Sequence, residues 1–241
     1  MIQSITMTED NYGLYDDNKS FNGYSENMTK PETYKNEREK QFMSYVIMCA
    51  NNNGIACATD SRSTLNGNTW YPEIENDNTQ KLFKTNKMLI ATFGLNKTFN
   101  GVDYSKRLEE EINETIKDKT IETPFDFCMK LLNKIKIIQS PNTYSFLIGF
   151  KNEICEYVLN QNGIQVFFKG KAIVTINNGA LPNYNLFAFN INEDIKKVAV
   201  KCKETCEEVI SLVQNKCVFQ FVGGPVQVDY IESKNIENID N

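Results

Sequence analysis

The sequence predicts a fold of the α+β class, because blocks of strand-like and helix-like sequence follow one another along the chain. Apolar runs rich in β-branched residues occur within residues 43–94 and 144–176. Three other stretches, 104–117, 123–138 and 193–214, repeat apolar residues with the period of an amphipathic helix. This order suits antiparallel sheets that stack face to face with helices outside.

The first two predicted strands form a hairpin. The apolar runs Met43–Ala50 and Gly54–Thr64 are separated by Asn51-Asn52-Asn53-Gly54. Asn and Gly tolerate the positive φ of a tight hairpin turn, which supports this prediction. The polar residues at the strand ends are Ser44, Asp60 and Arg62.

Two more strands follow the hairpin. Asp77–Lys84 carries Lys81 at the head of a short apolar run, and Leu89–Gly94 ends on a glycine. Between the hairpin and these strands, the Asn, Gly and Pro content of Leu65–Glu75 predicts a loop. The single tryptophan, Trp70, either lines a substrate pocket or anchors this loop, and anchoring is the commoner role.

Apolar faces mark the predicted helices. The second helix begins after Thr123, a capping residue, with a proline and an acid in its first turn. On the third helix Cys202 and Cys206 lie one turn apart, which favours core packing over a metal or redox pair. The residues expected to be buried on the first two helices are Leu108, Ile112 and Ile116, then Phe127, Leu131, Ile135 and Ile138.

Five further strands are expected after these two helices. Tyr144–Phe150, Ile154–Leu159 and Ile164–Phe168 are predicted to build a second sheet, and an Asn-Gly turn joins the last two. A short strand at Ala172–Ile176 comes before the long helix, and Gln227–Ile231 comes after it.

Composition excludes several classes of function. The 241 residues suffice for one domain with a sizeable core but not for two. A net charge of −5 argues against nucleic acid or an anionic membrane as a partner. No apolar stretch reaches the roughly 20 residues that span a bilayer, and a cytoplasmic protein is expected. With no histidine and no CxxC among seven cysteines, neither a metal nor a cofactor is expected.

The absence of histidine also limits the catalytic chemistry. A nucleophile here must take its base from a lysine, a carboxylate or a free α-amine. Hydroxyl, acid, lysine and glycine follow in the order Ser44, Asp60, Lys81 and Gly94. This order resembles that of proteasome β subunits and their bacterial relatives, the N-terminal-nucleophile hydrolases. Residues 222–231 are also similar to the terminal strand of that family, and the resemblance extends over roughly residues 43–232.

The resemblance implies a four-layer αββα sandwich of the N-terminal-nucleophile hydrolase type. It implies a threonine-type endopeptidase in which Ser44 replaces the threonine and its own α-amine acts as the base. Lys81 would lower the proton affinity of the hydroxyl, and Asp60, supported by Arg62, would hold the lysine charged. The Gly94 N–H would help to form the oxyanion hole. The candidates for the substrate pocket are Thr64 and Trp70.

The same resemblance implies a peptide or an unfolded protein as substrate and a homo-oligomeric ring, and it leaves room for an ATPase partner. An apolar helix stripe that needs a partner surface would also favour assembly, although the same residues suit the core of one subunit. The residues of this stripe are Leu108, Ile112 and Ile116, widened by Phe99, Tyr104 and Phe127.

Three positions depart from the family pattern. Asn178 stands in place of a serine, and Phe219 and Val222 stand in place of an aspartate and a serine that help to orient the α-amine. Two alternatives to a peptidase therefore stay open. One is a catalytically silent structural subunit, and the other is an amidohydrolase of the same fold acting on a non-peptide amide.

The polar composition of residues 1–42 predicts a disordered tail. It is a propeptide removed to free Ser44, a start assigned upstream of the true one at Met43, or a permanent extension. The predicted domain covers residues 43–232, and residues 233–241 form a polar C-terminal tail.

Overall fold

The computed structural model describes residues 44–65, 73–94, 97–98, 106–135, 143–177, 187–216 and 222–234. Several residues singled out from the sequence lie outside these ranges. They are residues 1–43, Trp70, Phe99, Tyr104, Ile138, Asn178 and Phe219.

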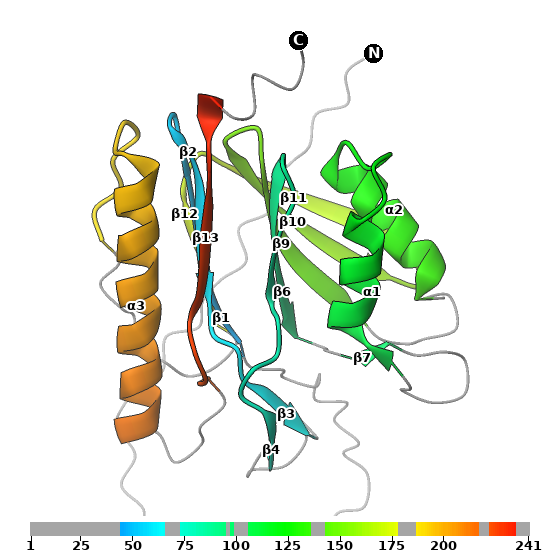
Figure 1. Cartoon of the computed structure of the whole chain (residues 1–241), viewed down its shortest axis with the longest axis horizontal. Helices are drawn as coiled ribbons and strands as arrows, with labels where there is room; N and C mark the ends of the chain where they lie inside the picture. Colours follow the sequence, from blue (N-terminus) through cyan, green and yellow to red (C-terminus); the bar gives the residue numbers. More distant parts are fainter. Residues whose placement is uncertain are drawn as a thin grey trace, which may run out of the picture. The chain divides into compact units, whose positions relative to one another are not determined.

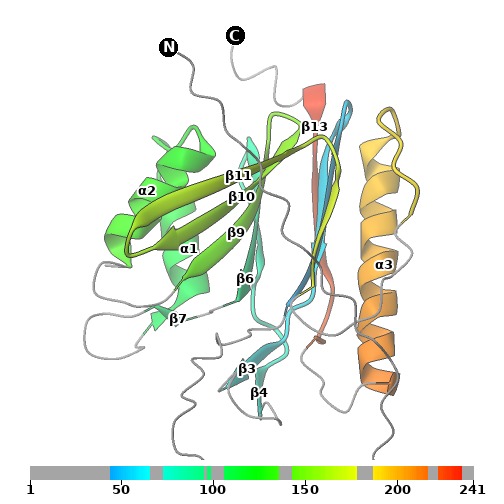
Figure 2. The ribbon, with the colours of Figure 1, turned by 180° about the vertical axis from the view of Figure 1, so that it is seen from behind.

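Two antiparallel sheets lie face to face between layers of helix (Figures 1 and 2). The first sheet has the strand order β12 (Ile173–Asn177), β1 (Tyr45–Asn51), β2 (Gly54–Thr59), β13 (Gln227–Glu232). The second has the order β11 (Gly163–Gly170), β10 (Glu153–Asn160), β9 (Tyr144–Phe150), β6 (Met88–Gly94), β5 (Leu82–Lys84).

Helices cover the outer faces of both sheets. Helix α3 (Ile195–Lys216) packs on the first sheet, and α1 (Leu108–Ile116) and α2 (Pro124–Lys134) pack on the second. The predicted α+β class and the four-layer αββα sandwich are therefore confirmed.

Three buried clusters fill the spaces between the layers. Along β1, Ile47 and Cys49 pack against α3, whereas Val46 and Met48 pack between the sheets. Every residue of β1 is buried, as expected for a strand covered on both faces. Gly149 lets the sheets approach each other, because a Cβ there would lie 2.5 Å from the Cγ2 atom of Ile55.

The β1–β2 hairpin forms as predicted. Asn51 pairs with Gly54, and Asn51 Oδ1 accepts a hydrogen bond from the Asn53 N–H at 2.8 Å. Within the turn Gly54 adopts positive φ, at 145°, whereas Asn52 and Asn53 do not. Glycine is required for packing as well, since a Cβ at Gly54 would lie 2.0 Å from the Ile231 carbonyl oxygen.

The predicted loop at 65–75 is partly strand. Its first residue ends β3 (Ser63–Leu65), and its last residues belong to β4 (Glu73–Asn76), which pairs antiparallel with β3. The helix expected from Tyr104 begins only at Leu108, because Lys106–Arg107 form β8, which pairs with β7 (Lys97–Thr98).

Thr123 caps α2 as predicted, and the cap is reciprocal. The Thr123 hydroxyl accepts a hydrogen bond from the Asp126 N–H at 3.2 Å, and the Asp126 carboxylate accepts one from the Thr123 N–H at 3.0 Å. Leu108, Ile112 and Phe127 are buried within this chain. They therefore do not form an exposed apolar stripe, and they give no support to the expected oligomer.

The cysteines of α3 are core residues. Cys202 and Cys206 are both 0% exposed and pack against β1 and β2, so the core-packing prediction is confirmed. Burial raises the pKa of both thiols, and it raises the pKa of Cys49 to about 12. Cys57 and Cys128, also buried, have raised pKa values for the same reason.

These thiols should be unreactive in the native protein. Iodoacetamide attacks the thiolate, and raising the Cys49 pKa from 9.0 to about 12 lowers its thiolate fraction at about pH 8 roughly a thousandfold. Mass spectrometry of alkylated peptides should show slow labelling of Cys49, Cys202 and Cys206 and fast labelling after unfolding in guanidinium. Equal rates in both states would contradict the burial of these cysteines.

Candidate active site

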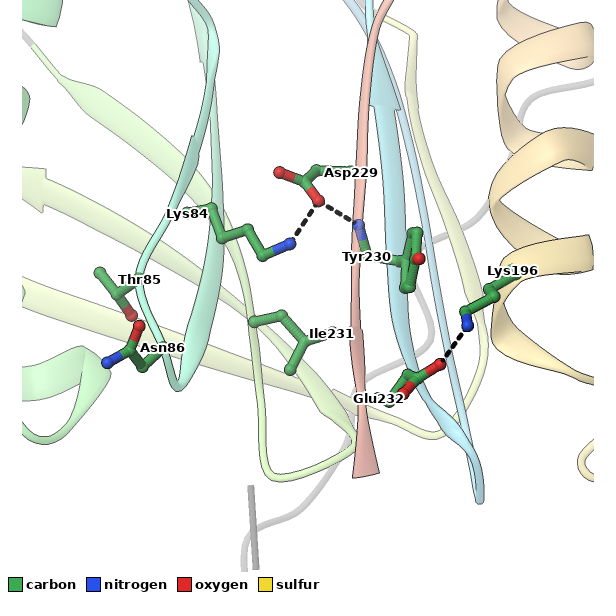
Figure 3. A pocket seen from close by; sticks show the side chains of 8 residues that line it. All are labelled: Lys84, Thr85, Asn86, Lys196, Asp229, Tyr230, Ile231 and Glu232. Carbon is green, nitrogen blue, oxygen red and sulfur yellow. Dashed lines mark hydrogen bonds and ion pairs between the residues drawn. The ribbon is translucent and has the colours of Figure 1, made fainter. Parts of the chain in front are cut away.

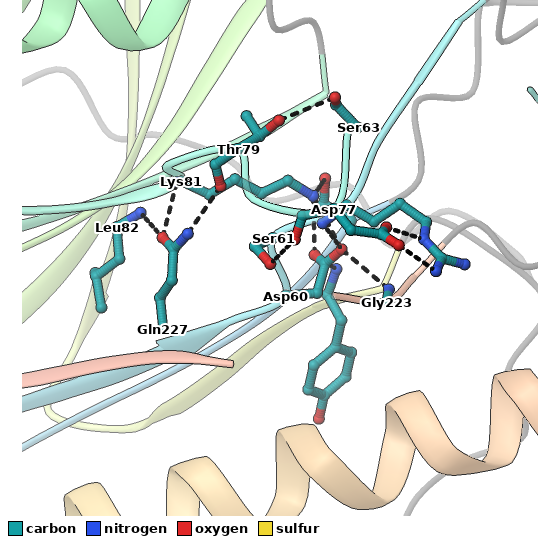
Figure 4. Close-up of polar contacts among 12 residues, drawn as sticks. Asp60, Ser61, Ser63, Asp77, Thr79, Lys81, Leu82, Gly223 and Gln227 are labelled. Atoms are coloured by element: carbon teal, nitrogen blue, oxygen red, sulfur yellow. Dashed lines mark hydrogen bonds and ion pairs between the residues drawn. The ribbon is translucent and has the colours of Figure 1, made fainter. Parts of the chain in front are cut away.

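Asp60 lies immediately after β2 and is 0% exposed. Its Oδ1 accepts a hydrogen bond from the Tyr45 N–H at 3.0 Å, and its Oδ2 accepts from the N–H groups of Arg62 at 3.2 Å and Gly223 at 3.4 Å. The Asp60 N–H donates in turn to the Tyr45 carbonyl oxygen at 3.1 Å. Three separate chain segments thus hold one buried carboxylate in place (Figure 4).

Lys81 precedes β5 and points into the same space (Figure 4). Its Nζ lies 3.0 Å from each carboxylate oxygen of Asp60 and 3.1 Å from Ser44 Oγ. Lys81 is 5% exposed and Ser44 3%, so little water reaches this contact. The structure therefore brings together three of the four residues that the family order put forward as catalytic.

Gly94, the fourth, ends β6 with φ 93°, a left-handed backbone that favours glycine. On the same strand the Thr92 N–H donates to the Lys81 carbonyl oxygen at 2.9 Å. Because backbone groups two residues apart in a strand point the same way, the Gly94 N–H also faces the side of Lys81. This direction suits the oxyanion role, which stays a prediction.

Arg62 lies beside the site and binds Asp77. Arg62 Nε is 2.5 Å from Asp77 Oδ1 and Arg62 Nη2 is 3.0 Å from Asp77 Oδ2, a bidentate pair. Gly223 and Gly224 pack against this pair, since a Cβ would lie 2.5 Å from Arg62 Cζ or 2.2 Å from the Asp77 carbonyl oxygen, respectively. The role of Asp77 was not predicted from the sequence. The only signal that could have found it is that a buried arginine needs a carboxylate partner.

The remaining sequence candidates have weaker support. Thr64 is half-buried in β3, opposite Ile74, and its pocket role stays a prediction. Val222, which replaces a polar residue of the family pattern, is 4% exposed and packs in the apolar cluster beneath α3.

A cavity of about 740 Å³ lies elsewhere, near the far ends of β5 and β13 (Figure 3). Its cations are already paired: Lys84 with Asp229 at 2.6 Å, and Lys196 with Glu232 at 2.9 Å. Neither Ser44, Asp60 nor Lys81 lines it, so we do not assign the active site to this cavity. The lining residues are Lys84, Thr85, Asn86, Lys196, Asp229, Tyr230, Ile231 and Glu232.

Within the described ranges, no cluster of three or more His, Cys, Asp or Glu side chains is arranged to hold a metal ion. None of the helices in that part of the chain has the length and apolar content needed to cross a membrane.

Comparison with known proteins gives structural likeness alone. No protein-family model matches the chain, and no curated protein does. It is similar to the solved structure of Anbu (ancestral beta-subunit) from Yersinia bercovieri, with 10% identity, a TM-score of 0.49 and coverage of 79% of this chain and 83% of the other. It is also similar to the Anbu (Gly-1) mutant from Hyphomicrobium sp. strain MC1, with 11% identity, a TM-score of 0.45 and coverage of 81% and 92%. At these values neither likeness determines an activity.

Removing Lys81 should destabilise the fold much more than removing an exposed lysine. Lys81→Met leaves the Asp60 carboxylate buried without its cation, which typically costs about 3–5 kcal/mol of unfolding free energy. Lys84→Met, at the end of the strand that follows Lys81, is the matched control, because the Lys84–Asp229 pair is 43% and 37% exposed and such pairs contribute about 0–1 kcal/mol. Urea unfolding of both variants measures the difference, and equal losses would contradict a buried ion pair.

Proposed function

We propose that this chain is a proteasome-related subunit that hydrolyses peptide bonds with Ser44 as an N-terminal nucleophile. The supporting observation is the single contact network in which Lys81 Nζ reaches both Ser44 Oγ and the Asp60 carboxylate. The resemblance in residue order supports the same assignment.

The geometry suggests how each group acts. Lys81 Nζ donates a hydrogen bond to Ser44 Oγ and would stabilise negative charge as this oxygen attacks the substrate carbonyl. An ammonium has three N–H donors and no lone pair, so Lys81 in its pair with Asp60 cannot accept the hydroxyl proton. The α-amine of Ser44, when free, takes that proton and passes it to the leaving amine. Water then hydrolyses the resulting ester and restores the hydroxyl.

This mechanism requires the Met43–Ser44 peptide bond to be absent in the active protein, because an amide nitrogen cannot act as the base. Removal of a propeptide or of an initiator methionine at Met43 would each produce that terminus. Intact-mass measurement on protein from its native source tests the requirement. A source protein that retains any residue before Ser44 rules the mechanism out.

Activity should depend on the Ser44 hydroxyl. A chain that begins at Ser44 is expected to hydrolyse an unstructured peptide, and Ser44→Ala is expected to lower kcat at least about 1000-fold. Ser44→Thr keeps the hydroxyl and should retain activity. Ser63→Ala is a matched control, since Ser63 is 5% exposed and outside the Ser44–Lys81–Asp60 network. Identical rates for Ser44→Ala and the unchanged protein would refute the assignment.

A catalytically silent structural subunit is the second candidate, and Val222 favours it. This buried apolar side chain offers no hydrogen bond to an α-amine at a position where the family pattern has a polar group. Under this candidate, Ser44→Ala changes stability alone.

An amidohydrolase acting on a non-peptide amide would use the same residues as the peptidase. Measuring hydrolysis of a panel of small amides together with the peptide substrate separates the two.

We also propose a homo-oligomeric ring. Apolar side chains that the fold leaves exposed support it: Phe125 is 53% and Met129 39% exposed on α2, four residues apart on one face.

A cytoplasmic location fits the six free cysteines of the described residues. We include an ATPase that acts together with the ring in this proposal.

The oligomeric state is directly measurable. Light scattering on the purified protein should give a mass that is a multiple of the single-chain 27.7 kDa. Phe125→Ser together with Met129→Ser should lower that mass if α2 lies in the contact. A mass of one chain that persists as concentration rises would exclude the ring.

A further inference from the structure

Gln227 is the first residue of β13, at the edge of the first sheet, and its side chain reaches the second sheet (Figure 4). Its Oε1 accepts hydrogen bonds from the N–H groups of Lys81 and Leu82, both at 2.9 Å. Its Nε2 donates to the Thr79 carbonyl oxygen at 2.8 Å. Two neighbouring N–H groups need an acceptor and one carbonyl needs a donor, so the orientation of the amide is unambiguous.

The segment that Gln227 binds leads into an edge strand, since Thr79 and Lys81 precede β5 and Leu82 is its first residue. β5 is the last strand of the second sheet and pairs with β6 alone, through Leu82 and Ala91 at its start. An edge strand presents unpaired N–H and C=O groups on its outer side. The Gln227 carboxamide therefore satisfies the Leu82 N–H, which a neighbouring strand would otherwise pair, together with the Lys81 N–H and the Thr79 carbonyl oxygen just before the strand.

Gln227 is also tied to the other half of the ion pair. Its Cα is in register with Thr59 of β2, the residue directly before Asp60. One residue therefore connects the end of β2, directly before Asp60, to the backbone of Lys81. The Lys81 peptide is held from both sides, because its carbonyl oxygen accepts from the Thr92 N–H on β6 at 2.9 Å.

We propose that Gln227 is a positioning residue, which fixes the Lys81 backbone so that its ammonium stays in contact with Ser44 and Asp60. This role rests on the proposed function, since positioning matters for catalysis only if Ser44 is the nucleophile. A lysine side chain has four rotatable bonds, and its reach is defined only if its backbone is fixed. Displacements near 1 Å can lower a rate about 100-fold, so loss of this anchor should act on kcat.

The test compares Gln227→Met with Gln165→Met in the full-length protein. Methionine keeps the length of the side chain and removes its hydrogen bonds, and Gln165 is an exposed residue of β11. Native-state hydrogen exchange at the Lys81 and Leu82 amides should accelerate at least about tenfold in Gln227→Met and stay unchanged in Gln165→Met. Unchanged exchange in both variants overturns the inference, whatever the activity.

Kinetics separate the catalytic role from a merely structural one. In the form of the protein that hydrolyses the peptide, Gln227→Met should lower kcat about tenfold with KM unchanged. Gln227→Glu keeps the acceptor for both N–H groups and should recover part of the loss. Faster exchange with normal kcat overturns the positioning role and leaves the proposed function intact.

A second readout applies if the unchanged protein hydrolyses nothing, so that the proposed function itself has failed. The Lys81 ammonium gives a distinct ¹H–¹⁵N signal only while it is held away from water. Loss of this signal in Gln227→Met, with its retention in Gln165→Met, would show that Gln227 positions Lys81. Retention of the signal in both variants would overturn the inference.

Discussion

The buried ion pair between Asp60 and Lys81 places the strongest constraint on this fold. Removing each ion from water costs several kcal/mol, and attraction offsets this cost only when the remaining hydrogen-bonding positions are filled. Here the backbone N–H groups of Tyr45, Arg62 and Gly223 fill those of the carboxylate, and Ser44 takes the third donor of the lysine. The start of β1, the end of β2 and the turn before β13 must therefore meet at one point.

Much of the fold could be predicted from local sequence. The apolar runs of β1 and β2 and the reciprocal cap at Thr123 depend on neighbouring residues, and the sequence predicts both the hairpin and the cap. The start of α1 was misplaced because Arg107, its N-cap, makes no side-chain cap hydrogen bond and so leaves no signal. The stacking of the sheets came from family resemblance, since periodicity alone gives elements and not their arrangement.

The identity of three site residues could be predicted from the sequence, but their arrangement in space could not. Ser44, Asp60 and Lys81 were recognised by their order, but their mutual distances depend on strand register and on how the sheets stack. Asp77 and Gln227 were missed because their partners lie in other segments of the chain. The Asp77 carboxylate accepts from the Arg62 side chain, and the Gln227 side chain accepts from the Lys81 N–H, and neither contact leaves a periodic pattern in the sequence. Prediction therefore failed for contacts between segments that no local pattern relates, whereas Asp60 and Lys81, which also connect the two sheets, were predicted from the family order.

The sequence separations within the site also set the order in which it can form. Asp60 and Gly223 are 163 residues apart, and Lys81 and Gln227 are 146 apart. Contacts of such separation form late, because loop closure must precede them. A chain synthesised only as far as α3 can build the β1–β2 hairpin and the second sheet. At that stage Asp60 still lacks the hydrogen bond from the Gly223 N–H, and the Lys81 backbone lacks the one to Gln227. The hydrogen bonds around Asp60 and the Lys81 backbone are thus completed only after most of the polypeptide has left the ribosome.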